Sequence, residues 1–90
     1  MTELSNDVKS NQYIFMIETE CDMNMITRLH IIFSRRRISV LDFQSTQVND
    51  GNSQRVLIIV EETKKNVLKL YHYVARQVDV MKVNLFEPVL

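Results

Sequence analysis

The stretch YIFMIETECDMNMITRLHIIF (residues 13–33) decides the fold, because the spacing of its apolar residues changes partway along it. Its first part, YIFMIET (13–19), is rich in β-branched and aromatic residues and predicts a well-covered strand. After a short polar segment, apolar residues recur at the spacing of one helical face. These residues are Met25, Ile26, Leu29, Ile32 and Phe33. Asp22 or Asn24 can cap the first turn of this predicted helix with a side-chain oxygen.

Two further strands are predicted after this helix, and they form a hairpin. SVLDFQSTQV (39–48) is polar enough for an edge strand, whereas RVLIIVEE (55–62) has an unbroken apolar centre. The segment NDGNSQ (49–54) joins them and contains Asp-Gly at 50–51, the strongest reverse-turn dipeptide in the chain. Asp42 lies among apolar residues of the first of these strands, so its side chain must face solvent or a partner.

A second amphipathic helix is predicted within KKNVLKLYHYVARQVD (64–79), followed by a last strand, VMKVNLF (80–86). The apolar stripe of the helix is Val67, Leu70, Tyr71, Val74 and Val78. In the strand, simple alternation puts Met81, Val83 and Leu85 on one face.

The order strand, helix, strand, strand, helix, strand predicts an α+β, ferredoxin-like βαββαβ fold. In this fold a four-stranded antiparallel sheet carries both helices on one face, and its first and third strands are central. Those are the two most apolar strands of this chain. We expect residues 13–88 to form this single domain and residues 1–12 to be a flexible N-terminal tail.

Composition excludes several classes of function. Lysine plus arginine and aspartate plus glutamate each total 11, so no overall field attracts nucleic acid or an anionic membrane, and we expect neither as a partner. Gly51 is the only glycine, so the chain lacks the several glycines that a P-loop or a dinucleotide-binding turn requires. One cysteine and two histidines are too few for a zinc site of N and S ligands, and we expect no metal or cofactor. The single cysteine and the absence of a signal core favour a cytoplasmic protein.

Three short motifs resemble the ACT domain in the small, regulatory subunit of acetohydroxyacid synthase (acetolactate synthase). FSRRRISV (33–40) is similar to the end of that domain's first helix and the start of its second strand, although Arg37 stands where the family has glycine. QVDVMKV (77–83) is similar to the segment that opens its last strand. Thr27-Arg28 matches a serine/threonine–arginine pair in its first helix.

The resemblance implies a non-catalytic subunit. Its catalytic partner would be a thiamine-diphosphate enzyme that condenses two 2-oxo acids in branched-chain amino acid biosynthesis. In this family the ACT domains form homodimers through edge strands and bind a small amino acid effector, typically valine, at the dimer boundary.

The resemblance also implies an effector site. Valine-responsive relatives carry an asparagine and a glycine in the turn after the first strand and an asparagine at the start of the second, at positions that fall on Cys21, Asn24 and Ser39. With their neighbours, the candidate effector-binding residues are Cys21, Asp22, Met23, Asn24, Met25 and Ser39. A ligand carboxylate held by N–H groups at a helix N-terminus needs close approach, which a Cβ obstructs. We therefore expect weak or absent valine feedback; alternatively, Asp22 and Asn24 only cap the helix.

Two regulatory functions remain open at this point. The first is the small subunit described above, and the alternative is a free-standing, homodimeric ACT-type module that binds an amino acid and regulates another enzyme. An enzyme would need an acid–base set, whereas Glu18, Glu20 and Asp22 are explained as edge and capping carboxylates. The run Arg-Arg-Arg at 35–37 could bind phosphate or an acidic partner, but we interpret it as complementing the dipole of the first helix.

Overall fold

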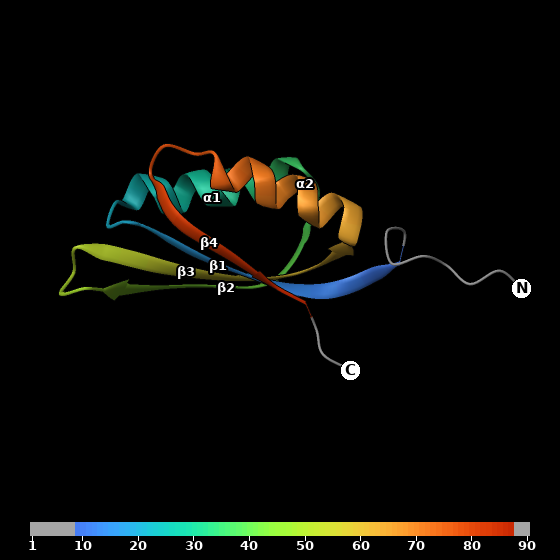
Figure 1. Ribbon diagram of the computed structural model, residues 1–90, viewed down its shortest axis with the longest axis horizontal. Helices are drawn as coiled ribbons and strands as arrows, with labels where there is room; N and C mark the ends of the chain where they lie inside the picture. The colour runs from blue at the N-terminus through green and yellow to red at the C-terminus, as the bar shows by residue number, and fades with distance from the viewer. Residues whose placement is uncertain (1–8, 88–90) are drawn as a thin grey trace, which may run out of the picture.

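A computed structural model describes residues 9–87 of the chain, and its elements follow the predicted order (Figure 1). They are β1 (Ser10–Glu20), α1 (Met23–Arg35), β2 (Ser39–Val48), β3 (Ser53–Thr63), α2 (Lys64–Ala75) and β4 (Val80–Phe86). β1 begins earlier than predicted, because residues 10–12 pair with the end of β3 instead of belonging to a tail. Residues 1–8 of the predicted tail and Pro88 lie outside the described residues.

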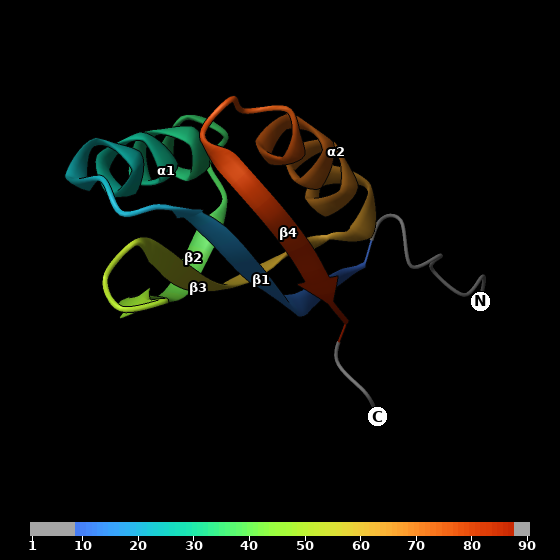
Figure 2. The same cartoon turned by 60° about the vertical axis from the view of Figure 1, so that its left-hand side comes forward.

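The four strands form one antiparallel sheet in the order β2-β3-β1-β4, which confirms the ferredoxin-like α+β fold. The apolar strands β1 and β3 are central, and β2 and β4 are the edges, as predicted. Figures 1 and 2 show both helices on the same side of the sheet. Within the described residues, neither helix is long and apolar enough to cross a bilayer.

The core lies between the sheet and the two helices. Alternate residues of β1 and β3 point into it, and the two helices close it from above. Phe15 of β1 meets Phe33 of α1 edge to face, with ring centroids 5.2 Å apart. The buried apolar residues of the core are Tyr13, Phe15, Ile17, Met25, Leu29, Ile32, Phe33, Ile38, Val56, Ile58, Val60, Val67, Leu70 and Val74.

Helix α2 ends earlier than its predicted apolar stripe. The helix stops at Ala75 and is followed by a turn, so Val78 is 94% exposed instead of continuing the stripe. The backbone N–H of Arg76 donates to the carbonyls of Tyr73 and Val74, which closes the last turn. The prediction for Val78 is wrong, because apolar spacing alone does not reveal where the backbone hydrogen bonding of a helix ends.

Strand β4 also departs from simple alternation. A register shift opposite Glu18 and Thr19 leaves Met81 as the extra residue of a bulge, and Met81 is 55% exposed. Val80 packs against the core together with Val83 and Leu85. The predicted face of Val83 and Leu85 is correct, but Val80 replaces Met81 on it because the bulge inverts the alternation.

The β2–β3 hairpin turns at the predicted Asp-Gly dipeptide. Asn49, Asp50 and Gly51 all have positive φ (53°, 57° and 85°), and the N–H of Gly51 donates to the carbonyl of Val48 at 3.1 Å. Asparagine, aspartate and glycine are the residues that adopt this left-handed backbone at least cost. The turn brings the start of β3 beside the β1–α1 turn, since the N–H of Cys21 donates to the carbonyl of Asn52 at 3.4 Å.

Candidate functional site

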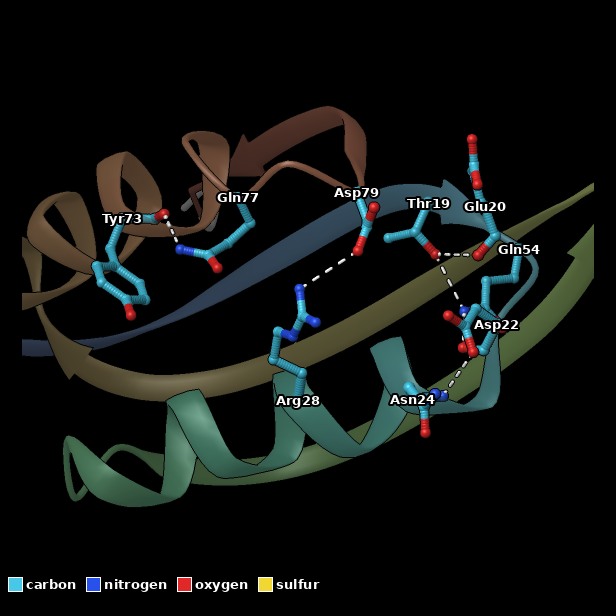
Figure 3. A network of polar contacts seen from close by, with 9 residues as sticks. All are labelled: Thr19, Glu20, Asp22, Asn24, Arg28, Gln54, Tyr73, Gln77 and Asp79. Atoms are coloured by element: carbon cyan, nitrogen blue, oxygen red, sulfur yellow. Dashed lines mark hydrogen bonds and ion pairs between the residues drawn. The ribbon is translucent and has the colours of Figure 1, made fainter.

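The turn between β1 and α1, which contains most of the candidate effector residues, is organised by Asp22. Its Oδ1 accepts a hydrogen bond from the backbone N–H of Asn24 at 2.9 Å (Figure 3). Its carbonyl accepts from the N–H of Met25 at 3.0 Å. Of the two predicted capping residues, Asp22 is therefore the cap. Asn24 has an ordinary helical backbone, so glycine is not needed there for conformational reasons.

This cap has an electrostatic consequence for any ligand. The N-terminus of a helix attracts anions through its free N–H groups and the positive end of the dipole. In α1 the carboxylate of Asp22 already lies there and occupies the N–H of Asn24. A ligand carboxylate would have to displace a covalently attached one and would be repelled by it. The arrangement thus opposes binding of an amino acid carboxylate at this turn.

Gln54, the second residue of β3, holds the β1–α1 turn in place through hydrogen bonds of its side chain. This residue was not identified from the sequence. Its side chain is 3% exposed, and its Nε2 donates to Thr19 Oγ1 and to the carbonyl of Asp22, both at 3.0 Å (Figure 3). Thr19, fully buried, donates in turn to the carbonyl of Glu20 at 2.8 Å. Only the sheet register reveals this pair, because Thr19 and Gln54 face each other across β1 and β3.

An open groove of about 480 Å³ lies beside the turn. It is lined by Cys21, Met23, Ile26, Ser45, Gln47 and Gln54, which come from the turn, α1, β2 and β3. Its volume is that of a small-molecule site. None of the lining residues is a lysine, arginine, histidine, aspartate or glutamate, so the groove offers amide and hydroxyl groups beside apolar surface. It offers no charged side chain to the carboxylate or the ammonium group of a free amino acid.

The structure separates the candidate effector residues into four groups. Cys21 and Met23 line the groove, while Asp22 and Asn24 form the cap beside it. Met25 is fully buried in the core, so its side chain faces away from the groove. Ser39 begins β2 opposite Glu61, about 26 Å along the strand from the groove residue Gln47. A single chain therefore does not bring Ser39 to the turn.

Two of the motifs that carry the family resemblance meet in space. Arg28 of α1 forms an ion pair with Asp79, which precedes β4, at 3.3 Å (Figure 3). The two side chains are 46% and 40% exposed, so solvent screens the pair and its contribution to stability is about 0.2–1 kcal/mol. Its main effect is positional, because it links the middle of α1 to the segment that leads from α2 into β4.

The edge strand β2 is the most open part of the sheet. Val40 and Leu41 are 40% and 48% exposed, and a register shift next to Leu41 makes a bulge against β3. Asp42 accepts a hydrogen bond from Gln44 Nε2 at 2.7 Å. On the helix side, the ring of Phe43 stacks on His30 with centroids 3.7 Å apart. An exposed edge with apolar residues is a surface on which another strand can pair.

Comparison with known proteins supports the fold. No protein-family model matches the chain. No curated protein matches it by sequence. The structure is similar to the ACT domain of GTP pyrophosphokinase from Chlorobium tepidum, with a TM-score of 0.70 and 14% identity over 87% of this chain and 100% of that one.

Two other solved structures are similar to the same extent. An uncharacterised protein from Thermotoga maritima has a TM-score of 0.73 at 13% identity, covering 88% of this chain and 98% of that one. Homoserine dehydrogenase from Thiobacillus denitrificans has a TM-score of 0.75 at 13% identity over 93% of this chain, but only 19% of that one. At such low identities these likenesses establish architecture. The chain has the fold of an ACT domain.

Proposed function

We propose that this chain is a cytoplasmic, non-catalytic regulatory module of the ACT type. In particular, we propose a small subunit of acetohydroxyacid synthase, or a close relative of one, with weak or absent feedback by valine. The ACT fold and the three sequence motifs support the assignment, and the ion pair of Arg28 with Asp79 joins two of those motifs. The proposal of weak feedback depends on one observation, the carboxylate of Asp22 at the N-terminus of α1.

The proposed module is a homodimer that pairs through β2. Antiparallel pairing of two β2 strands about a two-fold axis between Phe43 and Gln44 would bring the partner's Ser39 beside Val48, close to the groove. The candidate effector site would then be composite, with the turn from one chain and Ser39 from the other. This arrangement accounts for the distance between Ser39 and the turn within one chain.

The alternative function is a free-standing, homodimeric ACT-type module that binds an amino acid and regulates another enzyme. The groove beside the turn favours it, because a hollow of about 480 Å³ with the buried amide of Gln54 in its wall suits a small molecule. A ligand bound there would stabilise the folded chain by RT ln(1 + [L]/Kd), about 2.7 kcal/mol at a hundredfold excess over Kd.

Reconstitution separates these functions. The purified chain is mixed with the catalytic subunit of acetohydroxyacid synthase, and binding and the rate of acetolactate formation are measured with and without valine. We expect the chain to bind and to raise the rate, with valine changing the rate little. Absence of both binding and rate change would eliminate the small-subunit function. A thermal-shift screen of the twenty amino acids then tests the alternative.

A matched variant tests the role of Asp22. Asp22→Ser removes the negative charge but keeps a good helix cap, since serine is an equally favoured N-cap residue. We expect this variant to bind valine more tightly than the natural chain, measured by calorimetry. Equal affinities in the two proteins would contradict the proposed cause of the weak feedback.

A further inference from the structure

The zero net charge of the chain conceals a strong separation of charge. Neither residues 23–37 nor residues 64–76 contain an aspartate or a glutamate, yet they contain most of the eleven lysines and arginines. These cations are Arg28, Arg35, Arg36, Arg37, Lys64, Lys65, Lys69 and Arg76. Both segments belong to the helical layer in Figure 2, so that layer is basic, and the acidic residues between 9 and 87 all lie outside the two helices. The expectation of no overall field rested on the net charge and did not consider how the charges are distributed.

Only part of this positive charge is neutralised by ion pairs. Arg28 pairs with Asp79 at 3.3 Å, and Lys64 pairs with Glu87 at 3.2 Å. Arg36 and Lys69 form no ion pair with any residue between 9 and 87. Their charge is therefore available to an anion from outside the chain.

These two cations line the same hollow. It has a volume of about 190 Å³, lies between the end of α1 and the first half of α2, and is lined by Arg36, Ile38, Asn66 and Lys69. Three of the four lining side chains carry N–H donors, and none is acidic. The hollow is thus a small concave surface with two positive charges and an amide around it.

The guanidinium of Arg36 is held in place before any ligand arrives. It lies over the ring of Tyr73, 4.0 Å from the centroid, and Nη1 donates to the carbonyl of Ile32 at 3.5 Å. A cation stacked in this way loses less conformational entropy on binding than a freely rotating one. Its remaining N–H groups make no hydrogen bond to residues 9–87 and can donate to an anion.

Glu62 is the acidic residue nearest in sequence to Asn66, and it is already committed to the start of α2. Its Oε1 accepts from the backbone N–H of Thr63 at 2.8 Å and from Asn66 Nδ2 at 3.3 Å. The amide of Asn66 has a second N–H, which remains for a ligand. The carboxylate therefore orients Asn66 and makes no ion pair with Arg36 or Lys69, although its negative charge, bonded to an amide of the hollow, offsets part of their positive charge.

We propose that this hollow binds a phosphate dianion, either free or as the terminal group of a small phosphorylated molecule. Two cations and an amide match the charge and the oxygens of phosphate, whereas the ammonium group of an amino acid would be repelled there. The volume admits one phosphate with a few adjoining atoms. α1 has 13 residues and is about 20 Å long, so this site at its end is distinct from the groove at its start. The proposal does not depend on what the groove binds.

Nuclear magnetic resonance of the ¹⁵N-labelled full chain tests the proposal. Inorganic phosphate and glucose 6-phosphate are titrated separately, with sodium chloride at matched ionic strength as the reference. We expect saturable shifts at the backbone amides of residues 36–38 and 66–69 that chloride does not reproduce. Tighter binding of the ester assigns the site to a phosphorylated metabolite, and equal binding assigns it to free phosphate.

Paired charge variants decide whether the binding is site-specific. Arg36→Gln with Lys69→Gln should weaken phosphate binding at least tenfold. Arg55→Gln with Lys82→Gln removes the same charge from exposed positions of β3 and β4 and should change it less than twofold. If the first pair of substitutions unfolds the chain, Lys69→Gln alone, at an exposed position, is used in its place to test phosphate binding. Equal weakening by both pairs, or shifts that chloride reproduces, would overturn the proposal.

Discussion

At the scale of single residues, Arg37 is the clearest case of a side chain in a place that favours glycine. Its φ is 55°, and it follows the cap of α1, at a position where the family that these motifs resemble has glycine. The N–H of Arg37 donates to the carbonyl of Ser34 at 3.1 Å, and that of Ile38 donates to Phe33 at 3.3 Å. This is the hydrogen-bond pattern of a Schellman motif, completed by the burial of Ile38. The geometry survives without glycine, but the Cβ carries a conformational cost.

Replacing Arg37 therefore has a predictable effect. Arg37→Gly and Arg37→Ala both remove the same cation from the helix end, but only glycine removes the Cβ from a left-handed backbone. We expect the glycine variant to be more stable than the alanine variant by about 1 kcal/mol in urea unfolding. Equal stabilities of the two variants would show that Arg37 carries no such cost.

At the scale of elements, the tip of the β2–β3 hairpin and the β1–α1 turn form one hydrogen-bonded unit. Gln54 Nε2 reaches both Thr19 and Asp22, and Asn49 Nδ2 donates to Glu18 Oε1 at 3.5 Å. These bonds cross between segments that are far apart in the sequence. The position of the candidate effector turn therefore depends on the hairpin as much as on its own residues.

Removing the amide of Gln54 should loosen this unit. Gln54→Leu keeps the volume but leaves the fully buried hydroxyl oxygen of Thr19 without its donor, and the carbonyl of Asp22 with only its bond from the N–H of Met25. We therefore expect a loss of about 2 kcal/mol in the free energy of unfolding. Gln47→Leu, on the exposed edge strand, is the matched control and should change stability by less than about 0.5 kcal/mol. Faster amide hydrogen exchange at Cys21 in Gln54→Leu, but not in Gln47→Leu, would show that the loss of stability arises at the β1–α1 turn.

At the scale of the whole molecule, an exposed edge strand and a basic helical layer lie on a chain without net charge. The proposed dimer uses the edge and leaves the helical layer open to ligands. Edge pairing is prevented when a charged side chain faces the incoming strand. Leu41 of β2 and Leu68 of α2 are 48% and 38% exposed, so both tolerate lysine without disturbing the core.

Leu41→Lys is therefore expected to convert the dimer into a monomer, measured by sedimentation equilibrium, because it adds a charge at the proposed interface. Leu68→Lys adds the same charge on the opposite layer and should leave the dimer intact. A dimer that survives Leu41→Lys with its association constant unchanged would place the interface elsewhere.

Much of the fold could be predicted, because periods of two and of helical spacing are local properties. The ends of the helices and the irregularities of the strands were harder to predict from the sequence. Val78 continues the apolar spacing of α2, yet the helix has already ended, and Met81 alternates correctly with Val83 until the bulge is taken into account. At the candidate site, Asp22 was one of two residues predicted to cap α1, but Gln54 was not identified, because its partners are defined by sheet register.

The sequence alone determined the order of elements, the central and edge strands and the hairpin turn, and it narrowed the cap of α1 to Asp22 or Asn24, because each depends on residues within a few positions of one another. Only the tertiary structure decided which distant side chains meet. In the tertiary structure Arg28 forms an ion pair with Asp79, Gln54 is buried against the β1–α1 turn, and Ser39 lies far from that turn. The tertiary structure also gathered the cations of two helices on one layer around Arg36 and Lys69. Such groupings follow from the packing of helices on a sheet, which no local pattern of residues encodes.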